Sequence, residues 1–258
     1  MDFTLKIYKN LLTALKQANY NFFTFQEYCE GKAEGKYVIL RHDVDLKAEN
    51  SFETAKIEQD LGIKGSYYFR IVPQSNKPHI IKQIADLGHE IGYHYEDLSF
   101  FKGNESEAIK HFEKQLIHFR QYYPVKTICM HGSPTSKIDN KDIWKTNNYR
   151  DFSIIGEPYF DIDFNKMFYL TDTGRCWDGE KYSVRDKVKS SFTQSYHTTN
   201  QLIEAIKNNE LPNQMMITTH PQRWTDNKIE WSIELFSQNL KNIIKRMIIC
   251  SKALIIKL

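Results

Sequence analysis

The sequence predicts an α/β fold in which parallel strands and helices alternate and close into a β/α barrel. Short apolar segments of strand type alternate with helical segments at spacings of about 25–45 residues, which is the signature of parallel βαβ units. The length of 258 residues suits one barrel domain. Ionisable residues also follow several of the predicted strands, at the end where a barrel carries its active site.

The individual elements follow from hydrophobic periodicity and from signals at helix ends. Gly62 and Gly88 each follow a helical segment, as glycine often does at a helix C-terminus, and Asn104 with Glu107 can form a capping box. The predicted helices are residues 5–18, 50–61, 79–87, 105–122, 199–208 and 233–254, with a helical turn at 25–29. The predicted strands are residues 37–40, 65–69, 89–94, 125–130, 152–155, 167–170 and 214–218.

We interpret residues 1–258 as a single domain, because no linker, internal repeat or low-complexity segment interrupts the pattern. Residues 1–35 are expected to form an N-terminal helical extension, and residues 232–258 a C-terminal helix. An open doubly wound sheet is the alternative fold, but no GxGxxG motif follows the first predicted strand.

Composition narrows the class of protein. The net charge is +3 and no long Lys/Arg block occurs, so nucleic acid is not an expected partner. The four cysteines form no CxxC pair, and neither a secretion signal nor an apolar run of about 18 residues is present, so we expect a cytoplasmic protein without a membrane segment. The 15 Tyr and 16 Phe suit a carbohydrate site or an aromatic core. The oligomeric state stays open.

Five predicted strands end in ionisable residues. Because the carboxyl ends of barrel strands meet at one face, we expect these side chains to share one rim. They are Asp43 with Asp45, then His94, His131, Asp172 and His220.

Asp43 and Asp45 point to a metal ion. Residues two apart in an extended segment share a face, so both carboxylates project together. Two close anions repel each other unless a cation lies beside them. His94 on the same rim is a candidate second ligand, although a satisfied core histidine and a solvated aspartate pair are the plain alternatives.

The third ligand is open among His131, Glu96 and Asp97. Asp45, His94 and His131 together would form a set of two histidines and one carboxylate, which suits zinc or another divalent first-row metal. The alternative for His131 is a loop histidine bonded to the backbone.

The segment Thr171-Asp-Thr-Gly-Arg175 follows another predicted strand. Asp172 and Arg175 could form a loop salt bridge. The functional alternative is that Asp172 orients a catalytic group, or that Arg175 holds an anionic or polyhydroxyl part of a substrate. We interpret His89 as structural, and we expect the histidines at positions 42, 79, 111, 118 and 197 to lie in helices or loops at the surface.

Three motifs in this order resemble the polysaccharide deacetylase family. They are Asp43-Val-Asp45, His89-Glu-Ile-Gly-Tyr-His94 and Ile217-Thr-Thr-His220. The match covers roughly residues 36–225, and Gly65-Ser-Tyr-Tyr-Phe69 also resembles that family's second strand.

The resemblance implies an irregular barrel of about seven strands and a metal-dependent hydrolase. Its substrate would be an acylated amino sugar or polysaccharide precursor, from which an acetyl or other acyl group is removed. By the same resemblance Asp43 is the general base, Asp45 and His94 are metal ligands, and His220 is the general acid.

The chain also departs from the family pattern. The family's second metal histidine, four residues after the first, is here Leu98, which cannot bind a metal. The family's arginine-proline motif is absent, and His131-Gly-Ser-Pro134 stands about where it would fall. The alternatives are therefore an inactive barrel that binds carbohydrate, or a glycosidase with paired carboxylates on the same barrel.

Overall fold

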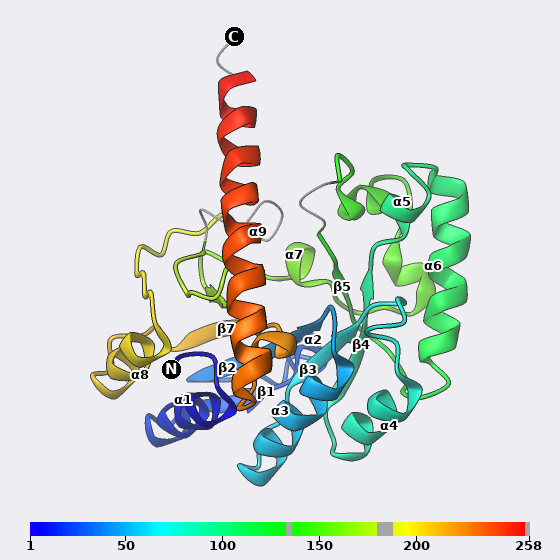
Figure 1. The fold of residues 1–258 in the computed structure, drawn as a ribbon. Helices are drawn as coiled ribbons and strands as arrows, with labels where there is room; N and C mark the ends of the chain where they lie inside the picture. Colours follow the sequence, from blue (N-terminus) through cyan, green and yellow to red (C-terminus); the bar gives the residue numbers. More distant parts are fainter. Residues whose placement is uncertain (133–135, 180–187, 256–258) are drawn as a thin grey trace.

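The computed structural model describes residues 1–132, 136–179 and 188–255, with no side-chain description for 246 and 248–255. Within these residues, seven strands form one parallel sheet that curves into a half-barrel surrounded by helices (Figure 1). This confirms the predicted irregular β/α barrel. The strands are β1 (Asn21–Phe23), β2 (Tyr37–Val44), β3 (Ser66–Phe69), β4 (Glu90–Tyr95), β5 (Ile128–Met130), β6 (Phe168–Thr171) and β7 (Gln214–Thr219). Their order is β5-β4-β3-β2-β7-β6, with β1 beside β2.

β2 lies at the centre of the sheet. Its start pairs with β1, where Tyr37 opposes Asn21, and its end pairs with β3, where Asp43 opposes Tyr68. β7 runs along the other edge of β2. Every residue of β2 is buried, as expected for a parallel strand covered on both faces. The pairing places the carboxyl ends of β2, β4, β5, β6 and β7 at one edge of the barrel.

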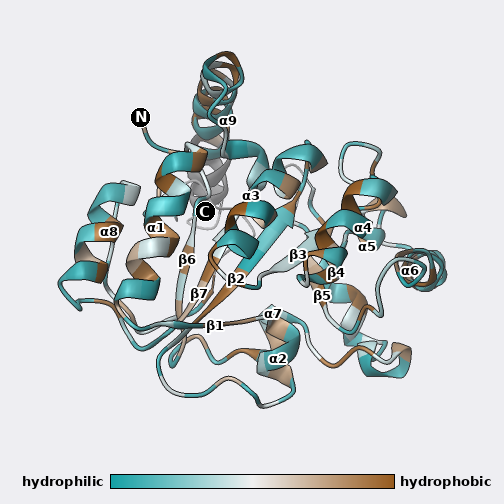
Figure 2. Ribbon diagram, turned by 90° about the horizontal axis from the view of Figure 1, so that it is seen from below, coloured by the Kyte–Doolittle hydropathy of each residue, from teal (hydrophilic) through white to brown (hydrophobic). Residues whose placement is uncertain are grey.

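Most helices cover the outer face of the sheet. Figure 2 shows α8, α1, α3, α4 and α6 in an arc outside the strands, with α2 and α7 on the opposite side. The helices are α1 (Leu5–Gln17), α2 (Phe25–Cys29), α3 (Ala48–Asp60), α4 (Pro78–Asp86), α5 (Asp97–Phe100), α6 (Glu105–Phe119), α7 (Pro158–Asp161), α8 (Thr199–Lys207) and α9 (Lys228–Ile255), with short 3-10 turns η1 (Asn140–Lys145), η2 (Tyr149–Phe152) and η4 (Pro221–Arg223). None of the described helices is both long and apolar enough to span a bilayer.

The inside of the barrel is filled by side chains from the strands and from α2. Tyr37, Ile39, Tyr68 and Met216 belong to this inner cluster. Tyr68 lies so close to Gly92 on β4 that any side chain at Gly92 would collide with its ring. The glycine two residues before His94 is therefore required by packing inside the barrel.

Two predictions about strands were wrong. Residues 152–155 form no strand, because the chain turns at Ser153 (φ 60°) after η2, and the nearby pairing is a single bridge between Thr127 and Gly156. β1 was not predicted, because its three residues are too few to show an alternating pattern.

Candidate metal and catalytic site

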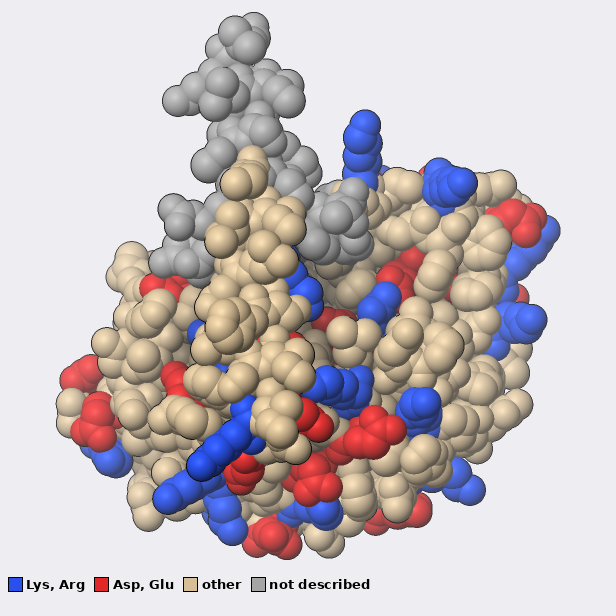
Figure 3. All heavy atoms as spheres, viewed as in Figure 1, with Lys and Arg blue, Asp and Glu red and all other residues tan. Residues whose placement is uncertain are grey.

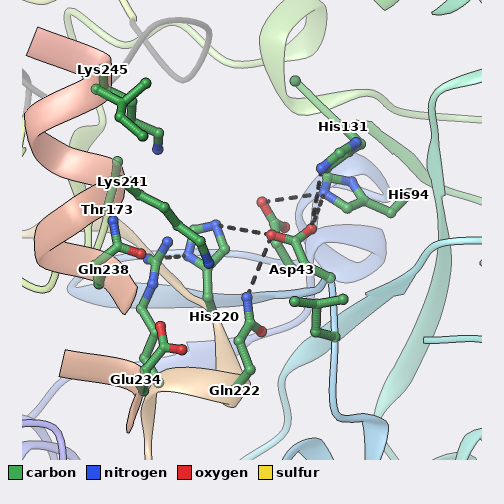
Figure 4. Close-up of a pocket in the computed structure, with 15 residues that line it drawn as sticks. Asp43, His94, His131, Thr173, His220, Gln222, Glu234, Gln238, Lys241 and Lys245 are labelled. Atoms are coloured by element: carbon green, nitrogen blue, oxygen red, sulfur yellow. Dashed lines mark hydrogen bonds and ion pairs between the residues drawn. The ribbon is translucent and has the colours of Figure 1, made fainter. Parts of the chain in front are cut away.

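A pocket of about 380 Å³ opens at the carboxyl ends of the strands. Five of the predicted residues line it, and Figure 4 shows the labelled ones among them pointing toward one another. They come from the end of β2 or just after it, from β4, from the residue after β5 and from the residue after β7: Asp43, Asp45, His94, His131 and His220. A pocket of this size is in the range that holds small ligands.

Three histidines direct their Nε2 atoms toward this pocket, because the Nδ1 atom of each ring is bonded elsewhere. The Nδ1 of His94 lies 2.9 Å from the carbonyl oxygen of Cys129, the Nδ1 of His131 lies 2.8 Å from Glu96 Oε2, and the Nδ1 of His220 lies 2.6 Å from Asp172 Oδ1. The carbonyl and the two carboxylates accept hydrogen bonds, so each Nδ1 is assigned as the donor. Arg223 Nη1 also lies 2.8 Å from Nδ1 of His220, but it donates to Asp172. The Nε2 atoms of the rings are left to face the pocket.

Asp45 Oδ1 is buried and has no hydrogen-bond partner among the described residues. It lies 3.6 Å from His94 Nε2 and 3.5 Å from His131 Nε2. Both distances exceed a normal N–H···O bond of about 2.7–3.2 Å. They match the separation of about 3.4 Å between ligands of a tetrahedral zinc ion with bonds of about 2.0–2.2 Å. These two distances suit a divalent first-row metal bound by Asp45 together with a histidine.

The neighbouring histidines also affect the ionisation of the Asp45 carboxyl. Burial alone would raise the pKa of the Asp45 carboxyl, but His131, His220 and His94 lower it below its usual value. Burial lowers the pKa of His94, which favours the neutral ring that metal binding requires. The pKa of His131 is raised, because Asp45 and Glu96 outweigh its burial.

Asp43 is held by Arg41 from the same strand. The guanidinium donates from Nε to Asp43 Oδ1 at 2.8 Å and from Nη2 to Oδ2 at 2.6 Å. Burial would raise the pKa of Asp43, but Arg41 and His94 lower it, so the carboxylate stays ionised. Its Oδ2 lies 3.7 Å from His94 Nε2, at the same edge of the pocket.

His220 is fixed by a buried group around Asp172. Asp172 Oδ1 accepts from Nη1 of Arg223 at 2.5 Å, and its Oδ2 accepts from the indole Nε1 of Trp224 at 2.8 Å. Burial would raise the pKa of Asp172, but Arg223 and His220 lower it to about 2. The structure thus places Asp172 behind His220, as the group that orients its ring, with His220 Nε2 3.9 Å from Asp45 Oδ2.

The other candidates for the third ligand lie elsewhere. Glu96 is behind His131 and also accepts two hydrogen bonds from Arg70, at 2.7 and 2.8 Å. Asp97 is fully buried and accepts from Tyr93 and His111. Leu98 packs in the apolar core beside α6. His131, from the end of the next strand, is the residue that faces Asp45.

Arg175 does not line the pocket. Its guanidinium packs over the rings of Phe3 and Trp231, at 5.1 and 5.0 Å from their centroids. Arg223 lines the pocket instead. The sequence offered one signal for it, since Arg223 follows His220 by three residues, which is one turn of the 3-10 helix η4.

The wall opposite His94 and His131 is mostly polar, with Ile244 as an apolar member. Sequence reasoning did not single out its residues, because most of them lie on α9, far along the chain from the motifs. Gln222 and Thr173 come from strand-end loops, and Gln238, Lys241 and Lys245 come from α9 (Figure 4).

Two groups of described side chains each bring three metal-ligand atoms within 4.8 Å of one another. The first, Asp43, His94 and Cys129, shares His94 with the pocket, but both oxygens of Asp43 already bind Arg41. The second is Cys176, Asp178 and His197, in which His197 Nδ1 lies 2.9 Å from Asp178 Oδ1. Neither offers the unpaired oxygen that Asp45 offers.

The prediction of a surface position for His42 was wrong. His42 is fully buried and lies 2.9 Å from Glu58 on α3. His89 is buried in the same group and bonds to Ala55 O and Gly65 N, which agrees with a structural role. His42 points away from the pocket because it alternates with Asp43 along β2.

Neither a protein family profile nor a curated protein matches this chain. The solved structures that resemble it include a CE4 family pseudoenzyme from Bacillus anthracis (TM-score 0.46, 14% identity, 81% of this chain and 61% of that chain). A mutant of this pseudoenzyme with restored enzymatic activity gives a TM-score of 0.46 at 13% identity, over 81% of this chain and 63% of that chain. The family 4 carbohydrate esterase PdaA of Bacillus subtilis gives 0.37 at 11% identity, over 81% and 86%.

This chain therefore spans about three fifths of the length of the two pseudoenzyme structures. The CE4 proteins are the group of polysaccharide deacetylases that the three sequence motifs resemble.

Proposed function

We propose that this protein is a metal-dependent hydrolase that removes an acyl group, such as acetyl, from an amino sugar or polysaccharide precursor. One observation carries the proposal. An unpaired buried oxygen of Asp45 and the Nε2 atoms of His94 and His131 converge beside an ionised aspartate and an oriented histidine.

Asp45, His94 and His131 would hold the ion, with zinc as the expected choice for two imidazoles and one carboxylate. A divalent ion at this place supplies a Lewis acid that polarises an acyl carbonyl and makes a water molecule more acidic. Glu96 and the carbonyl of Cys129 support the arrangement, because each fixes the tautomer of one ligand ring.

Asp43 is proposed as the general base that takes a proton from the attacking water. Arg41 fixes the direction of both carboxylate oxygens, so little reorganisation is needed when the proton moves. Each oxygen keeps a further lone pair, which allows one more hydrogen bond from water.

His220 is proposed as the general acid that protonates the leaving amine from Nε2. Asp172 accepts from its Nδ1 and stabilises the positive charge of a protonated ring, as the aspartate of a hydrolase triad does. Arg223 donates to Asp172 and keeps it ionised. Arg223 therefore affects His220 only through the hydrogen bond between Asp172 and His220.

The polar wall suits a hydroxyl-rich substrate. Gln222, Gln238 and Thr173 offer hydrogen-bonding groups, and Lys241 from α9 faces the same space. Lys241 has no ion-pair partner among the residues that the structure describes, so it can bind an oxygen-rich group.

The test uses a matched ester and amide with the metal-loaded protein. On an N-acetylated glucosamine oligomer, His220→Ala should lower kcat/KM by about 10²–10⁴-fold, because an amine must be protonated as it leaves. On 4-nitrophenyl acetate the same variant should keep most of its activity, because the aryl oxide leaves without a proton. Asp43→Asn should lose activity on both substrates.

His79→Ala is the control, since His79 is exposed on α4 and should leave both rates unchanged. Equal losses on ester and amide for His220→Ala would remove its role as the acid. A wild-type protein that binds metal and the sugar oligomer without turnover would replace the hydrolase with a carbohydrate-binding barrel.

A further inference from the structure

The longest helix of the protein carries a row of exposed apolar side chains. They lie on α9, and each is between 53% and 77% exposed: Ile229, Ile233, Phe236, Leu240, Ile243 and Met247. We call these six residues the α9 stripe. Ile244, 48% exposed, lies beside this row and also lines the pocket. Isolated exposed apolar side chains are common on proteins, but a continuous row of this kind marks an interaction surface.

The stripe faces away from the barrel, while the polar side of α9 packs against it. Gln238 and Asn242 are only 3% and 7% exposed, and Asn242 donates to the carbonyl oxygen of Gly174 at 2.9 Å. Lys241 points into the pocket from the same side (Figure 4). At 3.6 residues per turn the six stripe residues fall within about 40° of one line on the opposite side.

This orientation reverses that of an ordinary surface helix, whose apolar side faces its own core. Figure 1 shows α9 rising beside the barrel and extending beyond the strand ends, and Figure 3 shows an uncharged ridge along its outer side. The apolar side of α9 is therefore buried by nothing within the described part of the chain.

The spacing of the stripe selects a helix as the partner. Successive stripe residues are four, three, four, three and four positions apart, which is the a/d pattern of a heptad repeat. In the sequence the same spacing continues through Cys250 and Leu254. A narrow seam with this period packs against another helix, whereas a helix lying on a membrane needs a wider apolar face.

We propose that the α9 stripe pairs with the α9 stripe of a second copy of this chain. A two-fold interface uses the same patch on both partners, so the patch must complement itself. Beside the seam, Ser232, Ser237 and Asn239 carry no charge, and Glu230 pairs with Lys47 of its own chain at 3.7 Å. Six half-exposed side chains offer on the order of 600 Å² per partner, near the roughly 800 Å² of a standard interface.

The mass of the full-length protein in solution tests this pairing. By light scattering after gel filtration, the wild type should have twice the mass of one chain. The double variant Phe236→Glu/Leu240→Glu should have the mass of one chain, because two carboxylates would meet their copies in the seam. The milder Phe236→Gln/Leu240→Gln should dissociate at protein concentrations at least tenfold higher than the wild type.

Ile117→Glu is the matched control, because Ile117 is an apolar residue 57% exposed on α6. It should remain dimeric, and circular dichroism should show unchanged helix content in all variants. A monomeric wild type at 100 µM in these experiments, or a dimer that both double variants leave intact, would overturn the proposal. Sedimentation of a monomeric wild type with phosphatidylglycerol vesicles would replace the second copy with a membrane surface.

Discussion

Two carboxylates in this barrel each lie between two histidines, and they serve different purposes. Glu58 on α3 lies between His42 and His89, at 2.9 and 3.4 Å. Asp45 after β2 lies between His94 and His131, at 3.6 and 3.5 Å. The residue types are nearly the same, and both groups touch β2.

The difference lies in what else reaches each carboxylate. Glu58 Oε1 accepts hydrogen bonds from the hydroxyls of Tyr8 and Tyr67, at 2.5 and 2.9 Å, and the whole group is buried between β2 and α3. Asp45 Oδ1 and Glu58 Oε2 both lack a hydrogen-bond partner among the described residues, but Asp45 lines the pocket and Glu58 does not. A carboxylate between two histidines is therefore structural when tyrosine hydroxyls donate to it in the core. It suits a ligand site when both imidazoles lie about 3.5 Å away and the group lines a pocket.

The largest expected effect on folding comes from Glu58. Glu58→Ala should lower the free energy of unfolding by about 3–5 kcal/mol, because it leaves the hydroxyl of Tyr8 and the Nε2 of His42 buried without their partner. Urea unfolding followed by circular dichroism measures this. Glu53→Ala, on the exposed side of the same helix, should change stability by less than about 1 kcal/mol. Similar losses for both variants would end the distinction between the two carboxylates.

A smaller effect is expected from the residue behind His131. Glu96→Gln should weaken metal binding by about 10–100-fold, because the amide no longer fixes the ring of His131 as a carboxylate does. Calorimetric titration with zinc measures the affinity. Glu113→Gln, exposed on α6, is the control and should bind zinc as the wild type does. An unchanged affinity for Glu96→Gln would show that His131 needs no support from Glu96.

The smallest effect concerns the pH dependence of stability. The pKa of Asp172 falls from its usual 3.8 to about 2 in the folded protein, so its ionised form stabilises the fold above pH 4. This contribution, about 2 kcal/mol, is lost as the pH falls from about 4 to about 2. Asp172→Asn should thus be less stable than the wild type at pH 7, with a gap that narrows toward pH 2.

Unfolding in urea at pH 7, 4 and 2.5 follows that gap. If the wild type and Asp172→Asn lose stability in parallel over this range, the titration of Asp172 does not contribute to the stability of the fold. The hydrogen bond between Asp172 and His220 would then be weaker than its length indicates.

Long periodic segments made most of the fold predictable. The helices at α1, α3 and α8 and the strands at β2 and β7 have enough residues to show a period of 3.6 or 2. β1 has three residues, and its place depends on pairing with Tyr37, which local sequence does not encode. At residues 152–155 the β-type composition was overridden by the turn at Ser153.

The candidate site was predictable where a residue stands at the end of a strand. Asp43, Asp45, His94 and His131 share this position, and parallel pairing brings them together. For Arg175 the sequence left open a loop salt bridge and a contact with substrate, but the chain enters the left-handed region at that residue (φ 59°), and its side chain packs on Phe3. Contacts such as that of Arg41 with Asp43 depend on side-chain direction, which a linear sequence does not show.

Metal content is the measurement that tests the central claim most directly. The protein is incubated with zinc, cobalt or manganese, passed over a desalting column and measured by plasma mass spectrometry. The wild type should retain about one ion per chain, while Asp45→Ala and His94→Ala should retain almost none and keep the circular dichroism spectrum of the wild type. A wild type that retains no ion after any of the three incubations would contradict the assignment of Asp45, His94 and His131 as a metal site.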